Sequence, residues 1–403
     1  MTRQNIFPLV FMIALSITPV MSIHAPRFLA FWPLIIGLCG SGYWFLIKKE
    51  TFIYSKAYIA VIVSVIALCF ASLTWSISPA EAFEDAIKAS AILLIGSLFI
   101  SLSIAVPKSL IRPYLVFFPV GVIIAALLCS FELYANMPLY KAIRGISNDE
   151  HLGTAVMNRG VVFTTFCSLA SLFFLKDIEN TKIRFVSGLI MLISVLTMLC
   201  LTQSQSGHVA FGLGMIVFAL FPCKSKLPLS LLTVIIIACL ALTPQIVTLL
   251  YGLLIENGQD IPWLKDAYAG NRVEVWDFVM RYAMDNPLYG YGMEATRYVE
   301  TFEHNYIYHK SPTVLHPHNF SIQIWIEFGM VGICLASALF CTLHYRLNQF
   351  TAIDKKIMLS VYIPVLGVSA VGYGIWQSWW LGVLTLLFGL CLLMADKPLD
   401  KTE

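Results

Sequence analysis

The sequence predicts an all-α, polytopic integral membrane protein with about twelve transmembrane helices. Of its 403 residues 59% are hydrophobic and only 12% are charged, whereas a soluble domain is near a quarter charged. Apolar runs of about twenty residues, the length of a membrane-spanning helix, recur from end to end. The ten cysteines lie within these runs or at the end of one. They are therefore expected to be small buried apolar residues rather than a disulfide framework.

The expected spans follow from the apolar runs. They cover residues 7–23, 28–47, 57–75, 86–106, 114–133, 159–175, 185–202, 207–222, 228–250, 319–345, 357–374 and 376–395. The first run resembles a signal peptide in length. It is interpreted as a span because it lacks a clear small-residue cleavage site and another span follows at once.

The distribution of basic residues predicts the orientation. Alternate connections, together with both termini, hold sixteen of the 26 Lys and Arg residues. Cytoplasmic loops carry such an excess, so both termini are expected in the cytoplasm. The other ten basic residues, among them Lys88, Arg159 and Arg272, fall on the outer side and need a local reason. The net charge of +3 gives no reason to expect nucleic acid as a partner.

Three parts of the chain are expected. Residues 1–250 form a membrane bundle of spans one to nine, and residues 251–318 form a large periplasmic loop that carries Arg272. Residues 319–403 add spans ten to twelve and a short cytoplasmic tail. Within the loop, residues 271–284 have the pattern of a helix. Asn286-Pro287 ends this helix and begins the turn NPLYGYG.

Two histidines stand where the loop meets the tenth span, in LHPHNFSIQIWIEFGMVG. A histidine there titrates near neutral pH and could take a proton from a hydroxyl. His316 and His318 could also be solvated loop residues, or His318 or Asn319 could cap the helix. The polar residues Asn319, Gln323 and Glu327, four apart, would share one face of that helix. This favours a polar stripe that points into protein rather than lipid.

Three outer cations could meet an anion near these histidines. Arg272 opens the loop helix, where the helix dipole already gives positive potential, so an anion is expected at that end. Arg159 and Lys88 lie at the outer mouths of the sixth and fourth spans. Each has a simpler explanation: Arg272 could pack on Trp276, and the other two could snorkel to the interface. Together they predict an outward-facing pocket for an anion such as a diphosphate.

A metal site is not expected. The compact acidic and histidine cluster on the outer side is Asp149-Glu150-His151, and adjacent residues on a turn seldom converge on one ion. Fixed cations could instead stabilise a leaving group. No cofactor is expected either.

These residues resemble the O-antigen ligase family, which shares its membrane fold with Wzy-type polymerases and bacterial O-oligosaccharyltransferases. His318 and Gly329 match its His-x10-Gly signature, followed by Gly332. Arg272 with Trp276 and the NPLYGYG turn resemble its Arg-x-x-x-(Leu/Trp) helix and following turn. The segment TWSISPAEAFEDAIK, which ends at Lys88, resembles its W-S-x-x-P segment, and Arg159 resembles the basic residue that opens a mid-chain span.

The resemblance implies a metal-independent, inverting glycosyltransferase of the GT-C type in the inner membrane of a Gram-negative bacterium. The donor would be a glycan on undecaprenyl diphosphate, and the acceptor a hydroxyl of the lipid A-core in lipopolysaccharide biosynthesis. The diphosphate would lie among Lys88, Arg159 and Arg272 on the periplasmic face. His318 would act as general base, and the fixed cations would stabilise the leaving group.

Other functions remain open from the sequence. A Wzy-type polymerase would use the same chemistry with a second lipid-linked repeat as acceptor. A protein O-oligosaccharyltransferase usually carries additional C-terminal sequence. A transporter of lipid-linked sugars would bind the same anion without catalysis, but its cations should lie inside the spans rather than at one face. A purely structural scaffold would not explain the polar stripe.

Overall fold

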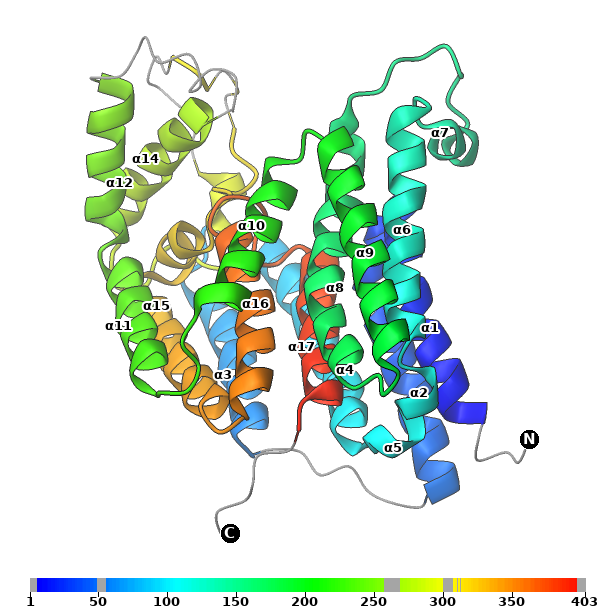
Figure 1. Ribbon diagram of the computed structural model, residues 1–403. Helices are drawn as coiled ribbons and strands as arrows, with labels where there is room; N and C mark the ends of the chain where they lie inside the picture. The colour runs from blue at the N-terminus through cyan, green and yellow to red at the C-terminus, as the bar shows by residue number, and fades with distance from the viewer. Residues whose placement is uncertain are drawn as a thin grey trace.

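The structure is a computed structural model that describes residues 6–48, 56–256, 269–299, 307–309, 311 and 313–396. Within these residues the chain is helical and contains no strand (Figure 1). Parts of the predicted outer loop, 257–268 and 300–306, and the predicted tail after residue 396 lie outside the described residues.

The longer helices carry the labels of Figure 1. They are Ile6–His24 (α1), Trp32–Lys48 (α2), Lys56–Ala71 (α3), Pro79–Ala105 (α4), Lys108–Ile111 (α5), Phe117–Tyr134 (α6), Pro138–Arg144 (α7), Asn158–Lys176 (α8), Thr181–Leu201 (α9), Gln205–Leu220 (α10), Leu227–Ala241 (α11), Thr243–Tyr251 (α12), Ala269–Asp285 (α14), Phe320–Leu347 (α15), Ala352–Ser369 (α16) and Ser378–Met394 (α17). Short turns of 3-10 helix cover Pro26–Ala30, Ser72–Thr74, Arg112–Tyr114, Thr154–Met157 and Ala295–Tyr298, and a π-helical turn covers Gly252–Glu256.

Every predicted span overlaps a helix or helix pair, although fewer pass a test of length and apolar character. Among the described residues, six helices are long and apolar enough to cross a membrane: α1, α4, α6, α8, α9 and α15. The pair α11 and α12 makes a seventh if it counts as one span. Four further apolar helices, α2, α3, α10 and α17, are shorter, and α16 carries Asp354, Lys355 and Lys356 in its first turns. The number twelve stays a prediction.

Two predicted spans are not straight. The run 228–250 divides into α11 and α12, which bend by 67° at their junction. The run 319–345 forms α15, which breaks at Gly329, where φ is +55° and ψ is −146°. Sequence periodicity does not show either break, because both halves of each run are apolar. Both breaks lie close to the residues described below.

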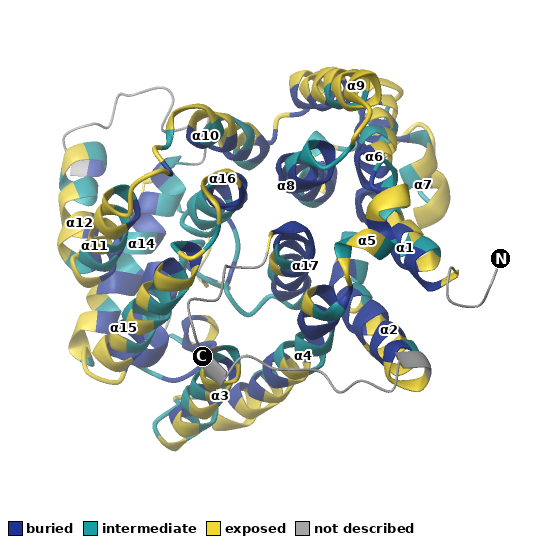
Figure 2. Cartoon of the chain, turned by 60° about the horizontal axis from the view of Figure 1, so that its bottom comes forward, coloured by how far each residue is buried: buried dark blue, intermediate teal, exposed yellow. Residues whose placement is uncertain are grey.

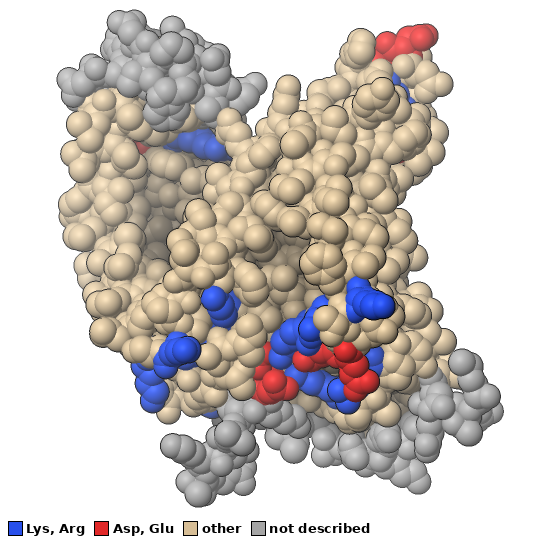
Figure 3. All heavy atoms as spheres, viewed as in Figure 1, with Lys and Arg blue, Asp and Glu red and all other residues tan. Residues whose placement is uncertain are grey.

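The helices pack in three groups of unequal size. The larger core joins α1, α6, α8, α10, α16 and α17, with α8 the most completely enclosed of the candidate spans. A second core joins α11, α12, α14 and α15, which stand together on one side in Figure 2. A third cluster links α3 and α4 to Met293 and Phe328. The surface is hollowed beside the second group, and basic atoms are visible inside that hollow (Figure 3).

Candidate functional site

The segment that carries the histidines is held between two helices. Asn319 caps α15, because its side-chain oxygen accepts hydrogen bonds from the backbone N–H groups of Ser321 and Ile322 at 2.9 and 3.2 Å. On the other side, the indole Nε1 of Trp276 in α14 donates to the carbonyl oxygen of Pro317 at 2.7 Å. His318 between them has a left-handed backbone with φ of +55°. His318 therefore lies between two neighbours, Pro317 and Asn319, that are each held by a hydrogen bond.

His318 is oriented by a backbone carbonyl. Its Nδ1 lies 2.5 Å from the carbonyl oxygen of Gly372, in the connector of residues 370–377 between α16 and α17. A carbonyl can only accept, so Nδ1 must carry the hydrogen, and the neutral ring then keeps its lone pair on Nε2. Burial lowers the pKa of His318, and the positive charge of Arg272 lowers it further, against the opposing effect of the Gly372 bond. Neutral His318 is therefore equipped to take a proton through Nε2.

His316 is held differently. Its ring centre lies 4.2 Å from that of His318, but its Nε2 faces the amide nitrogen of Gln377 at 3.3 Å. The oxygen of that amide accepts from the indole of Trp379 at 2.8 Å, which fixes the nitrogen toward His316. The pKa of His316 is lowered to about 3, mainly by burial, and the charges of His318, Arg297 and Arg159 also lower it. The Nε2 lone pair of His316 is thus already used as an acceptor.

Two of the predicted cations meet at the same connector. Arg272 lies in the first turn of α14, and Arg159 opens α8 with its guanidinium carbon 5.1 Å from the ring centre of Trp379. Burial raises the pKa of Tyr373 to about 12, while the charges of Arg159 and Arg272 lower it. Burial also lowers the pKa of Arg272. The charges of both arginines therefore act on the same tyrosine of the connector.

Lys88 has acidic neighbours on its own helix. Its Nζ lies 2.6 Å from Glu84 Oε1 and 3.3 Å from Asp85 Oδ1, on an exposed part of α4. The charge of Lys88 also acts on Glu294, whose pKa is raised mainly by burial. Arg297 forms an ion pair with Glu294 at 3.0 Å and influences His316. Arg297, which no motif singled out, is thus a further cation whose charge acts on the site.

The predicted polar stripe is buried, and it points at the connector. The side chains of Gln323 and Glu327 are 1% and 0% exposed, which confirms that these two members of the stripe face protein. The third, Asn319, is half-buried and caps the helix. Gln323 Nε2 donates to Glu327 Oε1 at 2.8 Å. Gln323 Oε1 accepts from the backbone N–H of Ile375 at 2.9 Å, and Glu327 Oε2 accepts from the indole of Trp376 at 2.6 Å. The stripe therefore fastens the connector to α15.

Gly329 and the NPLYGYG turn interlock. The backbone N–H groups of Tyr291 and Gly292 donate to the carbonyls of Ile326 and Glu327 at 2.8 and 2.9 Å. The N–H of Met330 donates to the carbonyl of Pro287 at 2.8 Å. A Cβ at Gly329 would lie 2.6 Å from the carbonyl carbon of Leu288, and φ there is positive. The glycine of the His-x10-Gly motif is thus needed for backbone contact rather than for chemistry.

The W-S-x-x-P segment packs on the same turn. The N–H of Ile77 donates to the carbonyl of Tyr291 at 3.0 Å, and the rings of Trp75 and Tyr289 lie 5.7 Å apart. A Cβ at Gly292 would meet Ser76 at 2.5 Å. Segments that are far apart in the sequence therefore close around the broken part of α15.

The connector is the part of the site that the sequence did not reveal. It contributes the carbonyl of Gly372, Tyr373, Ile375, Trp376 and Gln377, yet the predicted spans 357–374 and 376–395 left almost no connection there. The stretch AVGYGIWQ is mostly apolar, which hid the connection. Its two glycines and its position on the same outer side as the histidines were the available signals.

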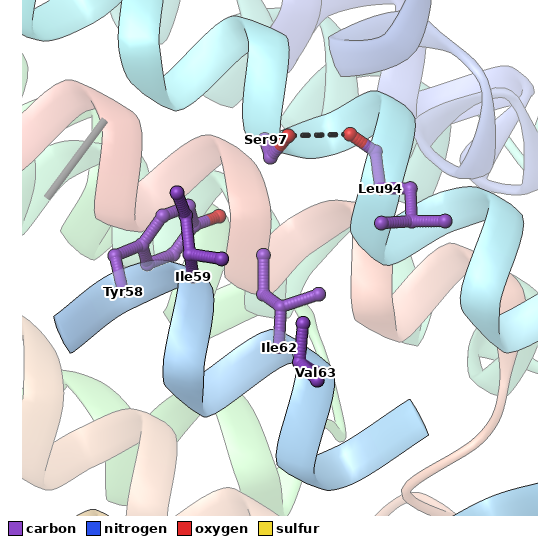
Figure 4. Close-up of a pocket in the computed structure, with 6 residues that line it drawn as sticks. All are labelled: Tyr58, Ile59, Ile62, Val63, Leu94 and Ser97. Carbon is purple, nitrogen blue, oxygen red and sulfur yellow. Dashed lines mark hydrogen bonds between the residues drawn. The ribbon is translucent and has the colours of Figure 1, made fainter. Parts of the chain in front are cut away.

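Two further features concern metal binding and anion binding. Among the described residues, no group of three or more His, Cys, Asp or Glu side chains is placed to hold a metal ion. An apolar pocket of about 150 Å³ lies elsewhere, between α3 and α4 (Figure 4). It is lined by Tyr58, Ile59, Ile62, Val63, Leu94 and Ser97. That lining contains no cation and no carboxylate, so the pocket has no part in anion binding.

Comparison with known proteins gives one family. The sequence model of the O-antigen ligase family matches residues 189–337, which include α14, the NPLYGYG turn and His318. Three relatives each named "Putative polysaccharide ligase" cover most of the chain. The protein of Rickettsia typhi is 27% identical over 361 residues, 84% of this chain and 80% of that protein. That of Rickettsia prowazekii is 25% identical over 351 residues, 84% and 79%, and that of Rickettsia conorii is 25% identical over 297 residues, 70% and 67%.

No solved structure matches the chain significantly. The family match and the relatives, together with the apolar helices, indicate a membrane protein of a family that implies glycosyl transfer. They support the assignment of this chain to the O-antigen ligase family, as its motifs predicted.

Proposed function

We propose that the protein is an O-antigen ligase that transfers a glycan from undecaprenyl diphosphate to a hydroxyl of the lipid A-core oligosaccharide. Transfer takes place at the periplasmic face of the bacterial inner membrane, without a metal ion and with inversion at the anomeric carbon. The donor diphosphate binds Arg272 and Arg159 beside Tyr373. Lys88 also binds the diphosphate, once its ammonium group leaves Glu84 and Asp85 and pairs with phosphate oxygens instead.

The proposed reaction uses His318 as general base. Nε2 of His318 takes the proton of the acceptor hydroxyl as its oxygen attacks the anomeric carbon. The bond from that carbon to the diphosphate oxygen breaks on the opposite side, and undecaprenyl diphosphate leaves with the electron pair. Guanidinium groups suit this step because their planar donors can bind two phosphate oxygens at once. The charge that develops on the leaving group is thereby stabilised without a metal.

The observation that carries this proposal is the hydrogen bond from His318 Nδ1 to Gly372. It supports the proposal because it favours the tautomer that keeps the lone pair on Nε2, at a residue whose pKa is influenced by Arg272. A solvated loop histidine would not have a dedicated backbone acceptor. A transporter would need no oriented base beside its anion site.

A reconstituted transfer assay tests the proposal. Purified protein in EDTA is given undecaprenyl-diphosphate-linked glycan, with lipid A-core in one tube and no second acceptor in another. Product that forms only with lipid A-core is the expected result. A ladder of longer lipid-linked glycans without lipid A-core would indicate a polymerase instead. Movement of the lipid-linked glycan across the bilayer with no transfer would overturn the enzymatic proposal.

Restoration of lost activity by Mg²⁺ or Mn²⁺ would overturn the metal-independent mechanism while leaving the transfer itself intact. The two conclusions can therefore fail separately in the same assay.

A further inference from the structure

The buried pair Gln323 and Glu327 in α15 has no place in the proposed reaction, because neither side chain reaches the surface of the site. From its contacts we infer that this pair is a positioning device for His318, which acts through the connector 370–377. The pair works because it contains one amide and one carboxylate in line. This inference rests on the proposed function, since His318 is the group being positioned.

The contacts form a continuous chain of hydrogen bonds. The backbone N–H of Ile375 donates to Gln323 Oε1 at 2.9 Å, Gln323 Nε2 donates to Glu327 Oε1 at 2.8 Å, and Trp376 Nε1 donates to Glu327 Oε2 at 2.6 Å. Both ends of the chain are donors that cannot become acceptors, one a backbone amide and the other an indole. Each side chain must therefore turn an oxygen outward.

The outward oxygens decide what the two inner atoms must be. A glutamine that turns its oxygen outward presents its NH₂ group inward, and a carboxylate presents its second oxygen inward. One glutamine and one glutamate therefore meet as donor and acceptor. Two glutamines would meet nitrogen to nitrogen, and two ionised glutamates would meet oxygen to oxygen unless one of them took up a proton. An unmatched polar contact at this burial costs free energy, because no water replaces the missing partner.

The connector transmits this match to the histidine. Gly372, whose carbonyl accepts from His318 Nδ1, lies in the same connector as Ile375 and Trp376. Trp376 also packs edge-on against Phe328, with ring centres 6.1 Å apart. If the hydrogen bond at Ile375 or Trp376 is lost, the carbonyl of Gly372 is no longer held against α15. Displacement of a reacting group by about 1 Å can cost about 10²-fold in rate.

The charged surroundings of the pair stay the same when the two residues are exchanged. Glu294 and Cys69 are the ionisable groups whose charges interact with Glu327, and Arg272 acts on His318. Exchanging the positions of amide and carboxylate keeps one carboxylate between α15 and the connector. The order of the two groups can therefore be tested without a change in net charge.

The test compares Glu327→Gln, Gln323→Glu and the double variant Q323E/E327Q with the wild-type protein in the reconstituted transfer assay. Glu327→Gln has an unmatched inner contact, and Gln323→Glu must take up a proton to match its neighbour, so each is expected to lose about 10- to 100-fold in kcat, which corresponds to about 1–3 kcal/mol. The KM for the lipid-linked donor should stay within about twofold, since the cations are untouched. The double variant restores all three hydrogen bonds and should recover kcat to within about fivefold of wild type.

A pH profile separates positioning from a general loss of structure. In the single variants the acid limb of the kcat profile should shift to lower pH. The Gly372 carbonyl raises the pKa of His318, so a weaker hydrogen bond lowers that pKa. The double variant should return the limb to its wild-type position. The unfolding temperature in detergent is measured for all four proteins to identify any variant that fails to fold.

Several outcomes would overturn the inference. These are single variants with wild-type kcat, a double variant no better than the singles, or a double variant that fails to fold although its hydrogen bonds should match. Absence of transfer by the wild-type protein would instead count against the proposed function. The positioning role alone fails if the wild-type protein is active but kcat does not fall in the single variants and recover in the double variant.

Discussion

His318 and His316 are adjacent rings with different free atoms. Gly372 accepts from Nδ1 of His318, whereas Gln377 donates to Nε2 of His316. Both neutral rings therefore carry their hydrogen on Nδ1, and the two rings, whose centres lie 4.2 Å apart, differ in whether the Nε2 lone pair already accepts a hydrogen bond. The proposed base role of His318 therefore depends on the groups around the ring rather than on the residue type.

We expect His318→Ala to lower kcat of transfer by about 10²–10⁴-fold, the usual contribution of a general base. The protein should still insert into the membrane, because His318 is outside the helical spans. His316→Ala is the matched control, and it should cost much less than His318→Ala, because His316 Nε2 is already an acceptor. Near-normal turnover of His318→Ala would contradict the general-base role.

The pH dependence should also reflect His318. Burial disfavours the imidazolium form and lowers the pKa, so the base form persists to lower pH than in an exposed histidine. The activity should therefore be full above pH 6.5 and fall only as the pH drops through the lowered pKa of the folded protein. A profile of kcat/KM against pH with its acid midpoint below 6.5 is expected. A midpoint at or above 6.5 would show that another group limits the rate.

Arg272 tests the role of guanidinium geometry. Arg272→Ala should lower transfer by about 10²–10³-fold, as loss of one electrostatic stabiliser of a developing anion does. Arg272→Lys keeps the charge but loses the planar fork, and it should still cost about tenfold or more.

Arg281→Lys on the same helix is the control, because Arg281 pairs with Asp277 at 2.9 Å. It should leave transfer unchanged. Equal effects of the two lysine variants would mean that Arg272 supports the helix rather than the diphosphate.

Residue types were predictable from the sequence, but their partners were not. The motifs placed His318, Arg272 and Arg159 at one end of the chain's spans, and the structure brings them around Tyr373. The group that accepts the hydrogen bond from His318 is the backbone carbonyl of Gly372, which has no signature in the sequence. Arg297 was one of ten outer basic residues with nothing in its spacing to distinguish it. Only the folded turn 290–298 places its charge beside His316.

At the scale of elements, the break in α15 organises the site. The break leaves the carbonyls of Ile326 and Glu327 to accept hydrogen bonds from the NPLYGYG turn. The outer part of the helix, with Asn319, Gln323 and Glu327, is thereby fixed at a separate angle from the inner part. The apolar pattern predicted this helix and its buried polar face. It could not predict the break, since a glycine within an apolar run is compatible with a straight helix.

Gly329→Ala should disrupt this arrangement. A Cβ at this position would lie 2.6 Å from two backbone atoms, the carbonyl carbon of Leu288 and the carbonyl oxygen of Pro287, and φ is +55°. We expect a lower unfolding temperature, from a loss of about 2 kcal/mol or more, and reduced transfer.

The control is Gly212→Ala in α10, where a Cβ would meet nothing within 4 Å. Alanine there should stabilise the helix by about 0.5–1 kcal/mol. A Gly329→Ala protein as stable as wild type would mean that the turn and α15 do not need their close backbone contact.

At the scale of the whole molecule, charge separates the two ends of the bundle. The end opposite the histidines gathers basic and acidic residues, which are visible at the bottom of Figure 3. There Lys176 pairs with the fully buried Asp354 at 2.5 Å, and Lys108 pairs with Asp396 at 2.7 Å. These pairs join α5, α8, α16 and the end of α17. The excess of Lys and Arg on alternate connections predicted which segments share this end, but not that their charges would be paired.

Stability and transfer should therefore be separable. Asp354 also accepts from the hydroxyl of Thr351 at 2.9 Å and from the backbone N–H of Asp396 at 3.0 Å. Asp354→Ala leaves the largely buried Lys176 without its closest partner, and breaking such a pair costs about 3–5 kcal/mol. We expect a large fall in the unfolding temperature, but an unchanged kcat for the fraction that remains folded, because the histidines lie at the other end of α16.

The exposed pair Arg112 and Glu179, at 2.7 Å, provides the comparison at the same end of the bundle. Glu179→Ala should cost only about 0–1 kcal/mol, because both partners are solvated. Both variants are measured for thermal unfolding and for transfer per folded molecule. If Asp354→Ala lowers kcat of the folded fraction as strongly as it lowers stability, then α16 transmits changes from one end of the bundle to the connector 370–377. The two ends would in that case not be independent.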